Sequence, residues 1–160
     1  MDAATADSVW QQTTQAIGRY DFAEANKRLT EALSQLEGSA RIPFLAQQGR
    51  VLGPMGRQAE AVEAVREAVD LLETPGTEGD AATWHRLGLT LCNARREAEA
   101  LPLLKRATEL APHSGPYWKT RGETEDFLGL TDEAERSYDT AKPKRFWANL
   151  MPPRPALRRP

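Results

Sequence analysis

Residues 81–114 read AATWHRLGLTLCNARREAEALPLLKRATELAPHS, and the residues that follow repeat their spacing. Trp84 and Trp118 lie 34 positions apart, and so do Gly88 and Gly122. Three more pairs share this offset: Ala100 with Ala134, Leu104 with Tyr138, and Ala107 with Ala141. Such a unit, with an aromatic residue in one segment and small residues in the next, predicts helix pairs that stack side by side.

This unit resembles the tetratricopeptide repeat (TPR), a family whose unit has large and small residues at set places. The matching residues are Trp84, Leu87, Gly88, Leu91, Ala100, Leu104, Ala107 and Pro112. The indole fills the gap between units, the small residues let helix backbones approach closely, and the proline cannot continue the second helix. The resemblance implies an all-α fold, a right-handed solenoid of antiparallel helix pairs.

The last copy of the repeat covers residues 115–145 and departs from the pattern in its first helix. Arg121 and Glu125 stand there in place of the usual apolar residues. We therefore expect this side of the unit either to be exposed or to pair with another segment. The unit is expected to lie near an end of the stack.

Two earlier units complete the repeat region. Residues 42–75 match the same pattern. Their matching positions lie five residues closer to the amino terminus than a strict 34-residue repeat would place them. The excess falls in residues 73–80, whose glycines and proline predict a loop. Residues 6–38 hold a weaker copy, with Gln12 and Thr13 where leucine and glycine are expected. The sequence thus predicts three clear units and one degenerate first unit.

Helical periodicity supports this interpretation without reference to any family. Between residues 58 and 73, apolar residues line one broad face, as packing against two neighbours requires. Asp21, followed by Glu24, is predicted to cap the start of a helix. Gly53 and Pro54 are predicted to end the first helix of the second unit early, because proline disfavours helical geometry in the residue before it.

The composition fits one folded domain, residues 1–141, followed by a tail, residues 142–160. A chain of 160 residues, 40% of them hydrophobic, can form a continuous but thin core. Its start has neither the basic flank nor the apolar run of a targeting segment, and no stretch approaches the roughly 20 apolar residues that span a bilayer. Cys92 is the single cysteine, so no internal disulfide can form. We expect a cytoplasmic protein with no membrane partner.

The tail is basic and rich in proline. Its basic residues are Lys142, Lys144, Arg145, Arg154, Arg158 and Arg159, and it has no acidic residue. The rest of the chain therefore has 15 basic against 23 acidic side chains. Beyond about Met151 the prolines favour an extended conformation over a helix.

Two interpretations of the tail stay open. In one, Phe146, Trp147 and Leu150 form a short helix (144–150) that caps the last unit. In the other, the arginines at 154, 158 and 159 contact an acidic partner, the acidic body of another copy, or nucleic acid. Nucleic acid is not expected, because the acidic body would repel phosphates. Self-association through the acidic body and the basic tail remains an alternative.

No arrangement of residues predicts catalysis, a cofactor or a metal site. His85 and Cys92 are seven residues apart on one predicted helix, about 10.5 Å in rise, which is too far for a nucleophile and its base. His113 has no second ligand at metal-binding spacing. The acidic cluster of Glu123, Glu125 and Asp126 is expected to be solvated or to face a partner.

The TPR resemblance implies that the first helix of each unit lines a concave surface. The matching positions are Trp10, Thr14, Ala46, Arg50, His85, Leu89, Asn93, Lys119 and Glu123. This mixed strip suits a partner peptide held in a largely preformed trough. Members that grip chaperone tails need lysine, asparagine and arginine at places that this chain fills differently, so that ligand is not expected. Single members also have structural interpretations, with Leu89 in the core, Trp10 as a cap and Arg50 as a surface charge.

The sequence therefore predicts a non-enzymatic adaptor that binds a partner protein or peptide in the concave groove. One alternative is an accessory subunit whose tail docks on an enzyme. Another is a cytoplasmic chaperone for a secreted client.

Overall fold

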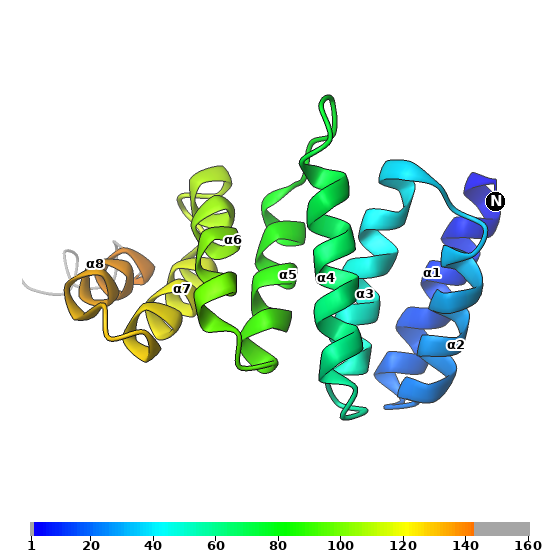
Figure 1. The fold of residues 1–160 in the computed structure, drawn as a ribbon, viewed down its shortest axis with the longest axis horizontal. Coiled ribbons are helices and arrows are strands. Elements are labelled where there is room, and N and C mark those ends of the chain that lie inside the picture. The colour runs from blue at the N-terminus through cyan, green and yellow to red at the C-terminus, as the bar shows by residue number, and fades with distance from the viewer. Residues whose placement is uncertain (1, 143–160) are drawn as a thin grey trace, which may run out of the picture.

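A computed structural model of the chain describes residues 2–142, apart from the side chain of Ala3. Within that range the helices are α1 (Ala3–Gly18), α2 (Phe22–Leu33), η1 (Gly38–Arg41, a 3₁₀-helix), α3 (Ile42–Leu52), α4 (Gln58–Leu72), α5 (Ala81–Asn93), α6 (Glu97–Leu110), α7 (Gly115–Phe127) and α8 (Thr131–Ala141). The α-helices form four antiparallel pairs that stack in chain order from α1 to α8 (Figure 1). The predicted all-α solenoid of helix pairs is confirmed.

Helix ends fall where the sequence signals predicted them. Helix α3 ends at Leu52, directly before Gly53 and Pro54. Residues 73–80 separate α4 from α5 and form a loop that projects from the row of helices (Figure 1). At the start of α2, the Asp21 carboxylate accepts a hydrogen bond from the backbone N–H of Glu24 at 3.1 Å. At the end of α3, Gly53 keeps helical backbone angles (φ −55°, ψ −60°), so the expected loss of helical geometry before the proline was wrong. The helix instead ends where Pro54 has no N–H to donate.

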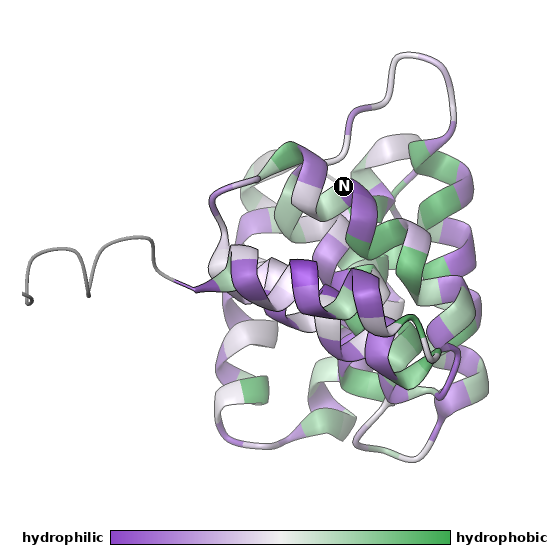
Figure 2. Cartoon of the chain, turned by 90° about the vertical axis from the view of Figure 1, so that its left-hand side faces the viewer, coloured by the Kyte–Doolittle hydropathy of each residue, from purple (hydrophilic) through white to green (hydrophobic). Residues whose placement is uncertain are grey.

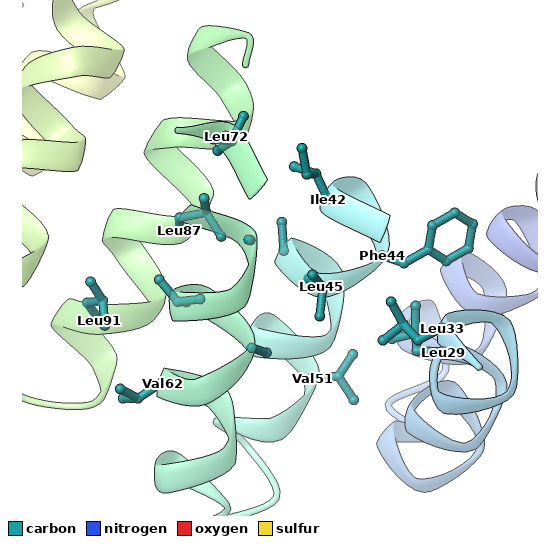
Figure 3. Packing of buried hydrophobic residues seen from close by; sticks show 14 of the residues in the cluster. Leu29, Leu33, Ile42, Phe44, Leu45, Val51, Val62, Leu72, Leu87 and Leu91 are labelled. Carbon is teal, nitrogen blue, oxygen red and sulfur yellow. The ribbon is translucent and has the colours of Figure 1, made fainter. Parts of the chain in front are cut away.

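The core is one continuous apolar layer that runs through the first three helix pairs. Figure 3 shows its centre, where side chains of α2, α3, α4 and α5 interlock. The labelled members are Leu29, Leu33, Ile42, Phe44, Leu45, Val51, Val62, Leu72, Leu87 and Leu91. Neighbouring units share this layer, because α3 contacts both its partner α4 and α5 of the next unit. The units therefore stabilise one another.

Small residues set the distance between helices. A Cβ atom added to Gly88 of α5 would lie 2.8 Å from Cγ of Leu104 in α6, closer than carbon atoms pack. A Cβ added to Gly49 of α3 would lie 3.0 Å from the Thr90 methyl group in α5. Glycine is thus required within a helix pair at Gly88 and gives a close approach between units at Gly49.

The degenerate first unit is a helix pair like the others. Thr13, which stands where glycine is expected, is fully buried. Its hydroxyl has no hydrogen-bond partner among the described residues. Trp10 of α1 meets Phe44 of α3 edge to face, with ring centroids 5.7 Å apart. This aromatic contact joins the first unit to the second.

The last unit buries a charge. Glu125 is completely buried, and its carboxylate accepts hydrogen bonds from Arg121 Nε at 2.8 Å and from the Ser137 hydroxyl at 2.6 Å. Arg121 also donates to the Thr108 hydroxyl of α6 at 3.1 Å. Of the two expectations for Arg121 and Glu125, pairing with another segment is therefore the one observed. The expectation of a solvated acidic cluster was wrong for Glu125, because the guanidinium and the hydroxyl replace the water that its charge would lose on burial.

The two other acids of that predicted cluster are exposed. Glu123 pairs with Lys119 at 3.6 Å, and Asp126 accepts a hydrogen bond from the Tyr138 hydroxyl at 3.0 Å. Figure 2, which faces the α8 end of the row, shows mostly hydrophilic residues on the helices nearest the viewer. The face of the last unit in that view is thus largely polar, although the unit also exposes Phe127 and Leu130.

Candidate functional site

Eight predicted groove residues form what we call the first-helix strip: Trp10, Thr14, Arg50, His85, Leu89, Asn93, Lys119 and Glu123. They belong to α1, α3, α5 and α7, the first helices of the four pairs. Most are exposed, including Leu89 at 39%, whereas Trp10 and His85 are half-buried. The ninth predicted residue, Ala46, is completely buried, so the expectation that it lines the groove was wrong. Its methyl group packs in the core instead.

Side-chain contacts join the strip where α5 meets α7. His85 Nε2 lies 3.0 Å from the Thr120 hydroxyl, and the imidazole stacks on the Tyr117 ring with centroids 4.4 Å apart. Burial, and next the charge of Arg86, lower the pKa of His85, so the imidazole is neutral at pH 7. One turn further along α7, the Thr124 hydroxyl lies 3.3 Å from Cys92 Sγ. These contacts hold α5 against α7 along the strip.

Two cations of α3 and α5, Arg50 and Arg86, form no close ion pair within the described residues, although the charge of Arg86 acts on Asp80 at longer range. Neither Arg50 nor Arg86 forms an ion pair or side-chain hydrogen bond with any described residue. Although Arg50 is exposed as a residue, partial burial of its guanidinium and the nearby charge of Arg86 lower its pKa. Guanidinium groups in such a position gain from an anionic or carbonyl acceptor supplied from outside.

Sequence reasoning missed Arg86, Tyr117 and Thr120. Arg86 lies one position after His85, and the repeat pattern alone does not show on which side of α5 it lies. The contact between His85 and Thr120 spans 35 residues, close to the repeat length of 34. That near-equality could have indicated Thr120, because equivalent residues of neighbouring units lie side by side in a solenoid.

Two grooves open on the other row of helices, the second helices of each pair. One has a volume of about 520 Å³, with Leu45, Gln48 and Leu52 of α3 at its base and α4 along its side. The other has a volume of about 550 Å³ and lies between α4 and α6, with Leu91 of α5 beneath them. Neither includes a residue of the first-helix strip. The first groove lies within one helix pair, whereas the second forms between neighbouring units and involves contacts that no single repeat contains.

The chemistry of the described residues does not point to a reaction. Burial raises the pKa of the Cys92 thiol above its ordinary value, so the thiol stays protonated at neutral pH rather than forming the nucleophilic thiolate. His85 contacts Thr120 and Tyr117 rather than Cys92. Over residues 2–142 there is no group of three or more histidine, cysteine, aspartate and glutamate residues that could hold a metal ion.

No helix between residues 2 and 142 combines the length and the apolar character needed to cross a membrane. The predicted tail contacts Arg154, Arg158 and Arg159, and the predicted capping helix at 144–150, lie outside the described residues.

No protein-family model and no curated protein matches this chain. Solved structures do match it. MamA is 20% identical, with 88% of this chain and 73% of MamA aligned at a TM-score of 0.66. YrrB, a TPR protein with an unusual peptide-binding site, is 21% identical over 88% of this chain and 69% of YrrB, also at a TM-score of 0.66. A tetratricopeptide repeat protein from Parabacteroides merdae is 14% identical over 86% of this chain and 52% of its own length, at a TM-score of 0.67.

These likenesses extend over nearly the whole described chain. The protein has the tetratricopeptide-repeat fold, as its resemblance to that family implied. At identities of 21% and below, the likenesses establish the fold and carry no information on the ligand.

Proposed function

We propose that this protein is a non-enzymatic adaptor that binds a segment of a partner protein along the first-helix strip. The observation that carries the proposal is a set of polar groups on α3 and α5 whose side chains make no hydrogen bond or close ion pair with any residue of the described chain. Leu89 exposes 39% of its surface, and Arg50, Arg86 and Asn93 make no side-chain hydrogen bond within the described chain. Apolar surface and unpaired donors side by side are what a partner segment needs to bind.

The charges of the strip favour an acidic segment. Burial is the main cause of the lowered pKa of Arg50, and the nearby charge of Arg86 adds to it, so the two guanidinium groups repel each other. An aspartate, a glutamate or a backbone carbonyl from the partner would relieve that repulsion and form charge-assisted hydrogen bonds. An apolar side chain next to it would cover Leu89. A partner segment with an acidic residue beside an apolar one is therefore the expected ligand.

The rigidity of the helix row also supports this function. The contacts of His85 with Thr120 and Tyr117 hold α5 and α7 in place before any ligand arrives. A preformed surface of this kind costs less conformational entropy on binding than a loop that must become ordered. YrrB, which shares the fold, has a peptide-binding site, so the fold can accommodate such a ligand.

The test is a set of native-lysate pull-downs, followed by titration of any recovered partner against purified chains. The groove variant is Arg50→Glu with Leu89→Arg. Its matched control is Lys105→Glu with Leu110→Arg, which makes the same kinds of change at exposed positions on α6. A third chain ends at Lys142. We expect the groove variant to bind at least about tenfold more weakly than the intact chain, or about 1.4 kcal/mol, while the control and the shortened chain bind normally.

Circular dichroism must show that all variants are folded. If the groove variant binds as tightly as the control, the strip is not the binding surface and the proposal fails. Loss of binding in the shortened chain alone would instead indicate an accessory subunit that docks through its tail.

A further inference from the structure

The groove between α4 and α6 has an apolar base and an acidic rim. Its apolar members are Val65, Val69, Leu91, Ala98, Pro102 and Leu103, and its charged members are Arg66, Asp70, Glu73 and Glu99. Val69 is half-buried and Pro102 is exposed, so part of the apolar base is open to solvent. A ligand for this groove needs apolar side chains between positive charges.

The acidic side chains of the rim differ in whether they form ion pairs within the described chain. Glu99 pairs with Arg96 and with Arg66. Asp70 and Glu73 form no ion pair with any described residue. On its α4 side the groove therefore contains two carboxylates that have no ion-pair partner among residues 2–142.

The backbone carbonyl of Ala98 is a third acceptor, because of Pro102. Pro102 lies inside α6, and proline has no N–H to donate to the carbonyl oxygen of Ala98 four residues earlier. Ala98 and Pro102 both line the groove. The carbonyl of Ala98 thus lacks its usual helical donor at a place where a ligand can supply one. A guanidinium group, which has five N–H donors, is well suited to such a mixture of carboxylates and a carbonyl.

The chain itself contains a segment of this chemistry. Residues 143–160 have five basic side chains and no acidic one, and residues 154–159 read RPALRR. In this segment Leu157 stands between Arg154 and Arg158. In an extended proline-rich conformation, at about 3.1 Å per residue, these arginines are about 12 Å apart. Packed helix axes lie about 8–10 Å apart, so arginines at this spacing can reach across the groove, one to Asp70 and Glu73 on its α4 side and the other to the Ala98 carbonyl of α6.

The segment is long enough to reach the groove. It follows α8, and α6 is the neighbouring second helix in the row (Figure 1). With packed helix axes about 8–10 Å apart, the groove on the far side of α6 lies about 20–30 Å from α8. Eighteen residues extend to about 60 Å. The path can therefore be spanned within one molecule.

We propose that residues 154–159 dock in the α4–α6 groove of the same chain, with arginines on Asp70, Glu73 and the Ala98 carbonyl, and Leu157 on the apolar base. This contact lies on the second helices and is separate from the first-helix strip. The attraction joins a basic segment to an otherwise acidic body, so it weakens as salt screens the charges. Within one molecule the tethered segment has a high effective concentration, so even a weak contact is populated.

The experiment places a nitroxide spin label on the tail of the full chain and observes the backbone amides by NMR. The label is attached at Ala156→Cys in a Cys92→Ser background, where the serine hydroxyl replaces the thiol as the group that contacts the Thr124 hydroxyl. We expect amide signals of residues 66–73, in α4 and directly after it, and of residues 98–105 in α6 to broaden. The signals should recover in about 0.5 M salt, where the Debye length is about 4 Å. The reversal variant Asp70→Lys with Glu73→Lys should lose the broadening.

The matched control, Asp7→Lys with Glu31→Lys, changes two exposed acids on α1 and α2 and should keep the broadening. A second sample mixes two kinds of chain. One kind has the nitroxide but no ¹⁵N, and the other has ¹⁵N but no nitroxide, so only contacts between molecules can broaden the observed signals. Broadening in this mixture would mean that the tail binds a second copy, which overturns docking within one chain. Absence of broadening on α4 and α6 in the first sample overturns the site. Persistence of that broadening in the reversal variant overturns the role of Asp70 and Glu73.

Discussion

The Ser137 hydroxyl donates a hydrogen bond to the buried carboxylate of Glu125 at 2.6 Å, which ties α8 to α7. Arg121 neutralises the same carboxylate and reaches on to Thr108 of α6. In the preceding unit the positions equivalent to Arg121 and Glu125 hold Leu87 and Leu91, both buried. One place in the repeat is thus filled by leucines in one unit and by a charge network in the next.

This substitution leads to a prediction about stability. Glu125→Leu leaves the half-buried Arg121 and the Ser137 hydroxyl without their acceptor, and we expect a loss of about 3–5 kcal/mol in the free energy of unfolding. The triple variant Arg121→Leu, Glu125→Leu, Ser137→Ala removes the whole network. It should recover to within about 1 kcal/mol of the parent chain or exceed it. Urea unfolding followed by circular dichroism measures both, and a neutral Glu125→Leu variant would contradict the prediction.

Gly88 and Gly18 form a matched pair for testing helix approach. A methyl group at Gly88 would collide with Leu104, whereas one at Gly18 would meet no atom within 4 Å. Gly88→Ala is expected to destabilise the fold by about 1–3 kcal/mol through overpacking. Gly18→Ala should be neutral or stabilising by up to about 1 kcal/mol, because it restricts the unfolded chain. Thermal unfolding distinguishes them, and equal effects of the two changes would refute the close approach at Gly88.

Thr13 offers a stabilising substitution. Its buried hydroxyl has no partner among the described residues, so its hydration is lost without compensation. Thr13→Val keeps the shape and removes the hydroxyl, and we expect a gain of about 1 kcal/mol in stability. The neighbouring Thr14 is the control, since it is exposed and its hydroxyl donates to the Trp10 carbonyl. Thr14→Val should change stability by no more than about 0.5 kcal/mol.

The lowered pKa of His85 predicts that the stability of the fold depends on pH in a specific way. The pKa of His85 lies below the ordinary value of 6.5 in the folded chain, mainly because of burial, so the unfolded chain binds a proton more readily. Its contribution to stability is complete above pH 6.5 and is lost as pH falls from 6.5 to the folded pKa. NMR titration of the imidazole should give a midpoint below 6.5. In His85→Asn the decline in stability over that range should be smaller, and an unchanged decline would assign it to other groups.

The fold could be predicted because repeat period, glycine positions and proline breaks act locally. Trp84 and Trp118 showed the unit length, and Gly53 with Pro54 marked a helix end. The candidate site could be predicted only in part. Leu89 is exposed as the groove prediction required, but Ala46 on the same kind of helix is buried. The place of a residue in the repeat does not determine how closely the neighbouring unit packs against it.

Periodicity and backbone chemistry were sufficient for the helix pairs and their order, because these depend on residues close together in the chain. The burial of Glu125 depends on the packing of α7 against α8, and the proximity of Arg50 to Arg86 and the acidic groove between α4 and α6 arise between units. They depend on how side chains more than ten residues apart share space and charge, and that arrangement exists only once the units have stacked.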